Sequence, residues 1–399
     1  MKIIVVPIAL LFGFIVSVSN AQSLPDVFSL SSGEKVKTKN EWYKKRKPEI
    51  INFFSKEVYG VIPDVNDYLF KYKSLEEDKL VLNGKAYRSQ VRMYIINKQN
   101  DSIGIDLLIY YPVSARKKPV PVFTLLNYGN HTLQEDTLIQ LPVSKLYPIE
   151  LKRASFARRF PIESIIDQGC GVITSCYGDF IPDKNVLFRK AAEEFYNIHP
   201  DSTGAISIWA WGYSRMVDYA RLQKYFDPEK VAVLGHSRTG KAALWAAAND
   251  ARIKYAFVNE SGNSGAKLNF HINPKAESIA IINKRFPHWF PSDYEKYNHR
   301  DSLRTLPYDQ HWLLATIAPQ NVYVADANKD IWSDPEGEFL SLKEAEKVYR
   351  FLGLKTFLPV TMPNIDSPTT KGFCGYHIRE GTHDLVPEDW NHFIQFIKQ

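Results

Sequence analysis

The chain has 399 residues, with 50 Lys or Arg against 44 Asp or Glu, and a formal net charge of +6. This mild excess forms no basic block, and no glycine-rich phosphate loop occurs, so nucleic acid and nucleotides are poor candidate ligands. Cys170, Cys176 and Cys374 match no zinc spacing, and the ten histidines contain no H-E-x-x-H motif, so neither a metal site nor a cofactor is expected. In an exported protein two of the cysteines could pair, and the sequence does not say which.

The first 21 residues predict a secretory signal peptide. Lys2 precedes an apolar run that ends in small residues at Ser19 and Ala21, so cleavage is expected after Ala21. An uncleaved anchor is the alternative, although the run is short for a membrane span. We expect residues 22–399 to form a single domain with an N-terminal extension, without stable membrane insertion, in a secreted or periplasmic protein.

Short apolar runs alternate with helical patterns from about Pro119 onward, after the segment 87–97 (YRSQVRMYIIN), which is typical of an antiparallel edge hairpin. The expected strands are VPVFTLLN (120–127), GVITSCY (171–177), KVAVLG (230–235), YAFVNE (255–260) and NVYVADA (321–327), and the expected helices are 206–225, 240–250 and 311–319. This order predicts an α/β three-layer sandwich with a mostly parallel central sheet. Two long interruptions, 128–161 and 261–310, are expected to shape a site or a lid.

Ser237 lies in the stretch GHSRTG (235–240), which does not match G-x-S-x-G because Gly240 comes one place late. The apolar run ends just before it and a helix is expected from Gly240. Ser237 is therefore predicted at a strand-to-helix turn, with its oxygen facing the carboxyl ends of the strands and the helical N–H groups able to stabilise an oxyanion. A helix-capping serine is the alternative.

A serine nucleophile needs a base, and the base needs an acid that orients it. In the α/β-hydrolase fold these follow in the order serine, acid, histidine. His383 lies in a short loop before the last helix and is preferred to His377, at an apparent strand end, and His392, inside that helix. Glu260 ends one strand and Asp330 follows the next, and fold logic alone favours Asp330. A structural histidine and ordinary loop carboxylates are the alternatives.

With these residues in place, the chain resembles the glucuronoyl esterases of carbohydrate esterase family 15, bacterial branch. The resemblance runs through blocks in order over nearly the whole mature chain, among them EVYGVIP, LNYGNHT, GHSRTGKAALWAAAND, NESGNSGAKL, RFPHWF and GYHIREGTHDLVPEDW. The motif G-x-S-R-x-G-K is specific, because ordinary lipases lack the Arg and the Lys, and it accounts for the displaced glycine. The family cleaves esters between 4-O-methyl-glucuronic acid of xylan and lignin alcohols. The resemblance thus implies a serine esterase (a 4-O-methyl-glucuronoyl methylesterase). We expect a monomer without a cofactor, although the sequence does not give the oligomeric state.

The resemblance assigns the same nucleophile and base as the fold argument but a different acid. It implies Ser237 as nucleophile, His383 as base and Glu260 as the usual acid, with Asp330 as a second acidic position on which some bacterial members rely. Arg238 resembles the arginine that helps to hold the oxyanion. An uncharged ester offers this arginine no carboxylate, which suits a role in the transition state.

Lys241, Glu277 and Trp332 resemble the residues that bind the sugar hydroxyls. The block NFHINPKAES (269–278) departs from the family's more regular glycine-glutamate pattern at Glu277, and His236 stands where fungal members have a disulfide-bonded cysteine. Two further hypotheses remain: the same mechanism on acetylated xylan or other plant cell-wall esters, and an inactive hydrolase fold that binds polysaccharide. A complete set of nucleophile, acid and base argues against the second.

Overall fold

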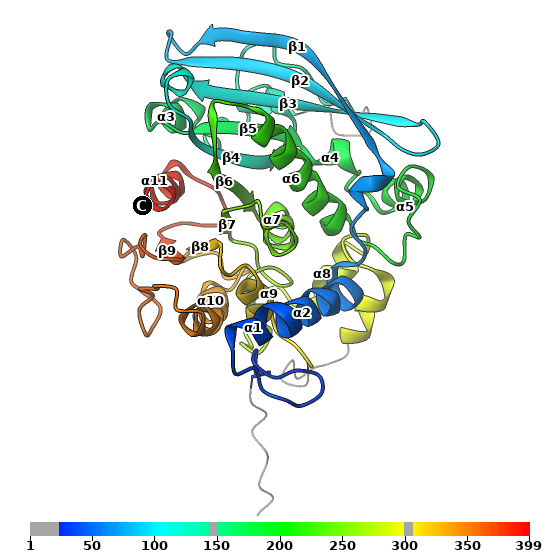
Figure 1. Ribbon diagram of the computed structural model, residues 1–399, viewed down its shortest axis with the longest axis vertical. Coiled ribbons are helices and arrows are strands. Elements are labelled where there is room, and N and C mark those ends of the chain that lie inside the picture. Colours follow the sequence, from blue (N-terminus) through cyan, green and yellow to red (C-terminus); the bar gives the residue numbers. More distant parts are fainter. Residues whose placement is uncertain (1–23, 144–150, 299–305) are drawn as a thin grey trace, which may run out of the picture.

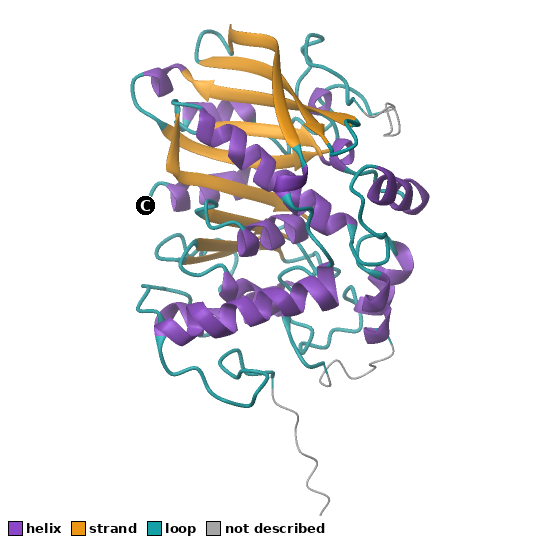
Figure 2. Cartoon of the chain, turned by 45° about the vertical axis from the view of Figure 1, so that its right-hand side comes forward, coloured by secondary structure: helices purple, strands orange, loops and turns teal. Residues whose placement is uncertain are grey.

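The computed structural model describes residues 24–143, 151–298 and 306–399, which form one twisted nine-stranded sheet flanked by helices (Figures 1 and 2). The spatial order of the strands is β1-β2-β3-β5-β4-β6-β7-β8-β9. Their bounds are β1 Leu69–Val81, β2 Ala86–Ile96, β3 Ser102–Pro112, β4 Val120–Asn127, β5 Gly171–Cys176, β6 Phe226–His236, β7 Tyr255–Asn259, β8 Asn321–Ala327 and β9 Cys374–Arg379. The pairs from β5 to β9 are parallel and those from β1 to β5 are antiparallel. The predicted mostly parallel sheet is confirmed.

Helices cover both faces of this sheet. Their bounds are α1 Lys39–Glu41, α2 Lys47–Phe54, α3 Ile162–Asp167, α4 Tyr177–Phe180, α5 Asn185–Glu194, α6 Ala205–Leu222, α7 Arg238–Asn249, α8 Ile279–Arg285, α9 Gln310–Thr316, α10 Pro335–Phe351 and α11 Pro387–Ile397. Successive residues of the buried strands point to opposite faces. Val122 and Val233 pack in the cluster with α6, α7, α9 and α10, whereas Phe123 and Leu234 pack with α3 and α11. The three layers follow from this alternation.

The predicted strands and helices correspond closely to those in the structure. The segments 120–127 and 321–327 coincide with β4 and β8, and the three predicted helices correspond to α6, α7 and α9. The segment 87–97 corresponds to β2, which pairs with β1 on one side and β3 on the other, so the expected edge hairpin is a three-stranded antiparallel ribbon. Figure 1 shows this ribbon at one end of the molecule and α1 and α2 at the other.

The N-terminal residues of the described chain are anchored on α9. The carbonyl oxygen of Pro25 accepts hydrogen bonds from His311 Nε2 and Trp312 Nε1, each at 3.0 Å. The Arg46 guanidinium lies 4.1 Å from the centre of the Trp312 ring, and its Nε donates to Val27 O at 2.8 Å. Burial lowers the pKa of His311 to about 3, so this imidazole is a neutral donor.

The predicted signal peptide, residues 1–21, lies outside the described residues. Among the helices of the described part of the chain, none is both long and apolar enough to span a membrane. Cys170, Cys176 and Cys374 are all buried free thiols, so the pairing left open by the sequence is not present.

Candidate active site

A cleft of about 320 Å³ lies at the carboxyl ends of β6, β7 and β8, where the α/β fold predicts a site. The residues that line it are Ser237, Arg238, Lys241, Glu260, Ser261, Gly262, Glu277, Arg285, Phe286, Trp289, Asp330, Trp332, Ser333 and His383. All eight residues singled out in the sequence are among them. The segment 261–310 supplies six of the lining residues, Ser261, Gly262, Glu277, Arg285, Phe286 and Trp289, as expected of an insert that shapes a site.

Ser237 occupies the turn between β6 and α7 in a backbone conformation that side chains rarely adopt, with φ 58° and ψ −125°. The turn is tight: a Cβ on Gly235 would lie 2.0 Å from the carbonyl oxygen of Thr239. Strand and helix therefore approach so closely here that only glycine fits at position 235. Such a turn holds the serine side chain out at the top of the sheet.

Thr239 explains why the glycine spacing is unusual. Its Oγ1 accepts a hydrogen bond from the backbone N–H of His236 at 3.0 Å and donates to the carbonyl oxygen of the same residue at 2.9 Å. A side chain thus braces the turn at the position where G-x-S-x-G has glycine. Gly240 packs against the next loop, where an added Cβ would lie 3.2 Å from Ser261 Cβ.

His383 directs one ring nitrogen at two carboxylates. Its Nδ1 lies 2.6 Å from Asp330 Oδ2 in a hydrogen bond and 3.2 Å from Glu260 Oε2. The two acids are buried, while the His383 side chain is 37% exposed and lines the cleft with Ser237. Both acids therefore orient the imidazole and leave Nε2 on the side away from them. Asp330 is therefore the nearer of the two acids, as fold logic favoured. The resemblance implied Glu260 as the usual acid instead.

Glu260 is held rigidly by its other contacts. Its Oε1 accepts from Arg379 Nη2 at 2.6 Å and its Oε2 from the backbone N–H of Asp384 at 2.8 Å. Burial raises the pKa of Glu260 to about 7, against the opposing charges of His383 and Arg379. Burial also acts on Asp330, but the hydrogen bond and charge of His383 outweigh it and lower the pKa of that carboxyl. Of the two acids, Asp330 is therefore the more readily ionised.

The two rival histidines lie elsewhere. His377 is buried in β9, with Nε2 2.8 Å from Asp389 Oδ1 and Nδ1 3.1 Å from the Tyr323 hydroxyl. Asp389 also accepts from Arg379 Nε at 3.0 Å, so this network supports Glu260 from behind. His392 lies against the His377 ring, at 4.5 Å between centroids, and outside the cleft lining. Sequence reasoning missed Arg379, whose signal was its charge at the end of β9, a strand in which every residue, Arg379 included, is buried.

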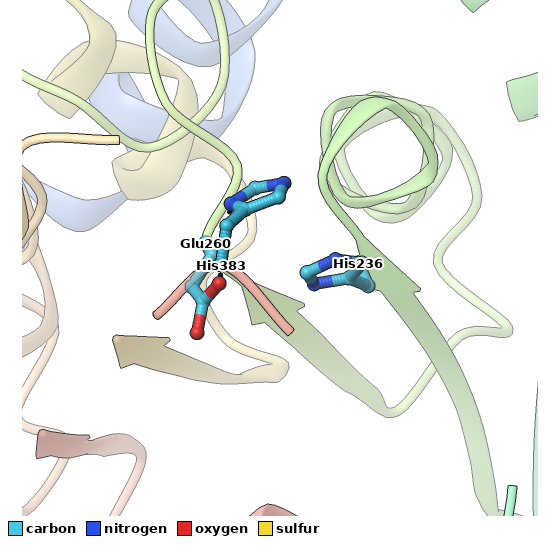
Figure 3. A group of neighbouring side chains, drawn as sticks. All are labelled: His236, Glu260 and His383. Carbon is cyan, nitrogen blue, oxygen red and sulfur yellow. Dashed lines mark ion pairs between the residues drawn. The ribbon is translucent and has the colours of Figure 1, made fainter. Parts of the chain in front are cut away.

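His236, Glu260 and His383 form a compact group, drawn in Figure 3, whose possible ligand atoms lie within 4.8 Å of one another. Hydrogen bonds already occupy both Glu260 oxygens and the Nδ1 atoms of His236 and His383. His236 Nδ1 lies 2.6 Å from Asn259 Oδ1, an acceptor that requires this nitrogen to carry the proton. Burial holds the pKa of His236 well below its ordinary value. Glu260 is thus committed to His383, Arg379 and Asp384, and His236 to Asn259, and we assign the group no metal.

Arg238 is fixed beside the serine by Asp183. Its Nη1 donates to Asp183 Oδ2, and its guanidinium lies 4.8 Å from the centre of the Trp289 ring. Asp183 Oδ1 accepts in addition from His288 Nε2 and Trp289 Nε1, each at 2.7 Å. These contacts and the charge of Arg238 outweigh burial and lower the pKa of Asp183 to about 2. The cleft therefore holds a permanently charged guanidinium of restricted mobility next to Ser237.

A second part of the cleft wall is built on Lys241 and Glu277. Lys241 Nζ donates to the carbonyl oxygens of Ser261 and Asn263 and to Glu277 Oε2 at 3.0 Å, so its three protons are all used within the protein. The Glu277 N–H donates to the carbonyl oxygen of Trp332 at 2.9 Å, which ties the aromatic residue to the same wall. Despite the irregular sequence around it, Glu277 is thus placed in the cleft beside Lys241.

Comparison with known proteins gives a consistent assignment. A family model described as "Glucuronyl esterase, fungi" matches residues 132–353. Carbohydrate esterase MZ0003 from an unknown prokaryotic organism is 38% identical over 393 residues, covering 94% of this chain and 88% of that protein. The chain belongs to the glucuronoyl esterase family. The resemblance found in the sequence is thereby confirmed, and with it the α/β-hydrolase fold.

Two further relatives of the glucuronoyl esterase family support this membership. The structure of a glucuronoyl esterase from Solibacter usitatus has a TM-score of 0.85 at 36% identity, and the match covers 95% of this chain and 97% of that one. A 4-O-methyl-glucuronoyl methylesterase from Hypocrea jecorina is 26% identical over 84% of this chain and 63% of its own length. The family model ends at residue 353, so it includes Ser237, Glu260 and Asp330 but not His383.

Proposed function

We propose that this glucuronoyl esterase family member is a serine esterase that hydrolyses esters of 4-O-methyl-glucuronic acid, as found between glucuronoxylan and lignin, through an acyl-enzyme intermediate. The observation that carries the proposal is the composition of one cleft. It combines a serine at a strained strand-to-helix turn, a histidine held by two acids, and a polar wall of Lys241 and Glu277 beside Trp332. The names of the relatives support glucuronoyl esters as the substrate class.

Ser237 is the proposed nucleophile and His383 the proposed base. Because Nδ1 of His383 donates to the carboxylates, Nε2 carries the lone pair that takes the Ser237 hydroxyl proton as Oγ attacks the ester carbon. The imidazolium then donates this proton to the departing alcohol oxygen, leaving the uronoyl group on Ser237. A water molecule, deprotonated by His383 in the same way, releases the acid and restores the serine.

Arg238 is proposed to stabilise the oxyanion together with N–H groups at the start of α7. Its guanidinium is held by Asp183 and by the Phe286 and Trp289 rings, so it requires little reorganisation when charge develops. In the same cleft, Lys241, Glu277 and Trp332 are proposed to bind the sugar. Since the Lys241 protons are all engaged, Glu277 is the group that presents a carboxylate oxygen to a hydroxyl, and Lys241 fixes its position.

A panel of esters tests this function: methyl and benzyl glucuronate, acetylated xylan and p-nitrophenyl acetate, each with the wild type and Ser237→Ala. We expect the glucuronate esters to have the highest kcat/KM and Ser237→Ala to lose activity by about 10⁶ in kcat. Equal efficiency on acetylated xylan would favour the acetylxylan esterase hypothesis. Sugar binding by calorimetry without turnover in the wild type would favour a binding protein.

Export is part of the proposal, since its substrates belong to plant cell walls. The apolar segment that ends at Ala21 supports a cleaved signal peptide and a secreted or periplasmic enzyme. Amino-terminal sequencing of the protein recovered from outside the cytoplasm is expected to begin at Gln22. Recovery with Met1 in a membrane fraction would indicate an anchor instead.

A further inference from the structure

Two carboxyl groups that have no cationic partner among the described residues are buried behind the cleft. Asp326 lies on β8 and Glu338 on α10, and each residue is 0% exposed. They lie close enough to interact electrostatically, and the proposed mechanism uses neither of them. Buried carboxylates are costly unless a cation or several hydrogen-bond donors stabilise them. Their environment therefore has to explain how they are tolerated.

Glu338 has one well-bonded oxygen. Oε1 accepts hydrogen bonds from Ser261 Oγ at 3.0 Å and from the backbone N–H of Gly262. The Ser261 hydroxyl oxygen in turn accepts from the N–H of Ala266 at 2.7 Å. Glu338 thus pins the first residues of the segment that follows Glu260.

The other three carboxyl oxygens are different. Within the described residues, Glu338 Oε2 and both Asp326 oxygens receive no well-aligned hydrogen bond. The Tyr376 hydroxyl interacts with Asp326 and also has the carbonyl oxygen of Pro335 within reach at 3.4 Å, so its single proton serves at most one of the two, and its oxygen can accept from a protonated Asp326. As neutral acids, the two groups would provide the missing donors themselves: one O–H toward the other carboxyl and one toward Tyr376.

The charged groups around the pair also disfavour ionisation. Glu260 and Asp330 add negative charge on the cleft side of Asp326. Lys241 is the cation that faces Glu338, but its three protons go to Ser261 O, Asn263 O and Glu277. Neither buried carboxyl therefore has an ion-pair partner within the described part of the chain.

We propose that Asp326 and Glu338 form an un-ionised carboxylic acid pair, and that Glu338 is a positioning residue that fixes residues 261–262 and through them the sugar wall of the cleft. Ser261 follows Glu260 directly, and its carbonyl oxygen holds Lys241. Gly262 is so close to Glu277 that an added Cβ would lie 2.9 Å from Glu277 Oε2. Loss of the Glu338 contact would therefore displace Lys241 and Glu277. The role in sugar binding rests on the function proposed above, whereas the protonation state does not.

The titration of the pair gives the sign of its pH dependence. Burial raises the pKa of Glu338 to about 8 and that of Asp326 well above its ordinary value. For Glu338 the folded protein keeps a proton that the unfolded chain loses above the ordinary glutamate pKa of 4.5. The contribution to stability is complete below that pH and is lost as the pH rises through about 8.

Two substitutions at position 338 separate a neutral acid from a carboxylate. Glu338→Gln keeps an acceptor for Ser261 and Gly262 and an N–H toward Asp326, but cannot ionise. We expect it to retain the wild-type kcat and KM at pH 6–7 and to lose less thermal stability than the wild type between about pH 5 and pH 8. Glu338→Ala removes the acceptor and is expected to raise KM for benzyl glucuronate roughly tenfold. Its effect on p-nitrophenyl acetate should be much smaller.

Glu346→Ala is the matched control, because Glu346 is buried on the same helix but pairs with Lys343 and Arg350. It should lower stability without separating the two substrates. The proposal is overturned if Glu338→Gln is as damaging as Glu338→Ala. It is also overturned if Glu338→Ala and Glu346→Ala affect both substrates alike.

Infrared difference spectroscopy tests the protonation state without any substrate. At pH 6 the carbonyl band of protonated carboxyl groups should be stronger in the wild type than in Asp326→Asn/Glu338→Gln, which keeps only the contribution of other raised carboxyls such as Glu260. Equal bands in the two proteins would overturn the acid pair even if glucuronate esters are hydrolysed. Failure to hydrolyse any glucuronate ester would instead reject the proposed function and leave the infrared result intact.

Discussion

His383 and Asp330 are joined by a 2.6 Å hydrogen bond between Nδ1 and Oδ2. Glu260 lies on the same nitrogen at the longer distance of 3.2 Å, and both of its oxygens are held by Arg379 and the Asp384 N–H. The shorter bond and the more readily ionised carboxyl therefore belong to the same residue. We therefore propose Asp330 as the acid that orients the imidazole, with Glu260 as a second acid in a fixed position.

Substitution of the two acids tests this division. Asp330→Asn is expected to lower kcat on benzyl glucuronate by about 10² or more, because an amide can favour the wrong imidazole tautomer. Glu260→Gln should cost roughly tenfold, since Asp330 still holds the ring. Melting temperatures measured alongside separate catalytic loss from unfolding. A severe Glu260→Gln beside a mild Asp330→Asn would restore the order that the family resemblance implies.

The pH profile tests the same contacts independently. Burial lowers the pKa of His383, but the hydrogen bonds and charges of Asp330 and Glu260 outweigh it and raise the value to about 9. A base must be neutral, so kcat/KM should rise with pH toward about 9. Because Glu260, in contact with His383, titrates near pH 7, the rising part of the pH–rate profile should reflect both groups.

Asp330→Asn removes a charge that stabilises the imidazolium, so the rising limb of the plot of kcat/KM against pH should move to lower pH. His392→Ala, on a histidine outside the cleft, should leave it in place. A limb that does not move in Asp330→Asn would mean that another group controls the rate.

The sequence predicted well those helices and strands in which burial determines the order of apolar and polar residues. β4 and β8 lie inside the sheet, so each is a continuous apolar run whose limits in the sequence are also the two ends of the strand. β1 (LFKYKSLEEDKLV) is an edge strand with mostly exposed or half-buried residues, and Leu69 is 65% exposed. Its charged sequence shows no alternation of apolar and polar residues. The strand is stabilised by pairing with β2 along nearly its whole length. Such tertiary pairing has no local signal.

The same distinction applies to the site. Ser237, Glu260 and Asp330 follow strand ends, which topology brings together. Arg285, Phe286 and Trp289 come from the irregular segment 261–310, where no periodicity indicates which side chains face the cleft. The support of Glu260 by Arg379, 119 residues away in the chain, is likewise a property of the folded protein alone.

Thr239 offers a test of the serine turn. Thr239→Ala removes both hydrogen bonds to the His236 backbone and should lower the free energy of unfolding by about 1–3 kcal/mol. Thr239→Gly recreates the G-x-S-x-G spacing but loses the same brace and adds backbone freedom, so it should be less stable still. Thr239→Ser keeps the hydroxyl and is the control, measured by denaturant unfolding. A Thr239→Gly protein as stable as the wild type would show that the brace contributes nothing.

Glu277 is the residue from which we expect sugar specificity. It is nearly buried, with a side-chain exposure of 7%, and its Oε2 is paired with Lys241, so the other oxygen is held in a fixed position on the cleft wall. Glu277→Gln keeps the shape and lets Lys241 bond to an amide oxygen, but weakens a charge-assisted hydrogen bond to a sugar hydroxyl. KM for benzyl glucuronate should rise about tenfold, while hydrolysis of p-nitrophenyl acetate, which has no sugar, stays unchanged.

Lys241→Met is the informative contrast to Glu277→Gln. It leaves Glu277 and two carbonyl oxygens without their donor and should destabilise the fold by about 3–5 kcal/mol. Loss of activity in that variant should therefore extend to both substrates and follow the melting temperature. Glu336→Gln, on an exposed residue of α10, controls for charge removal alone. If Glu277→Gln reduced both activities equally, Glu277 would support the cleft without contacting the sugar, and Trp332 would be the remaining candidate on this wall.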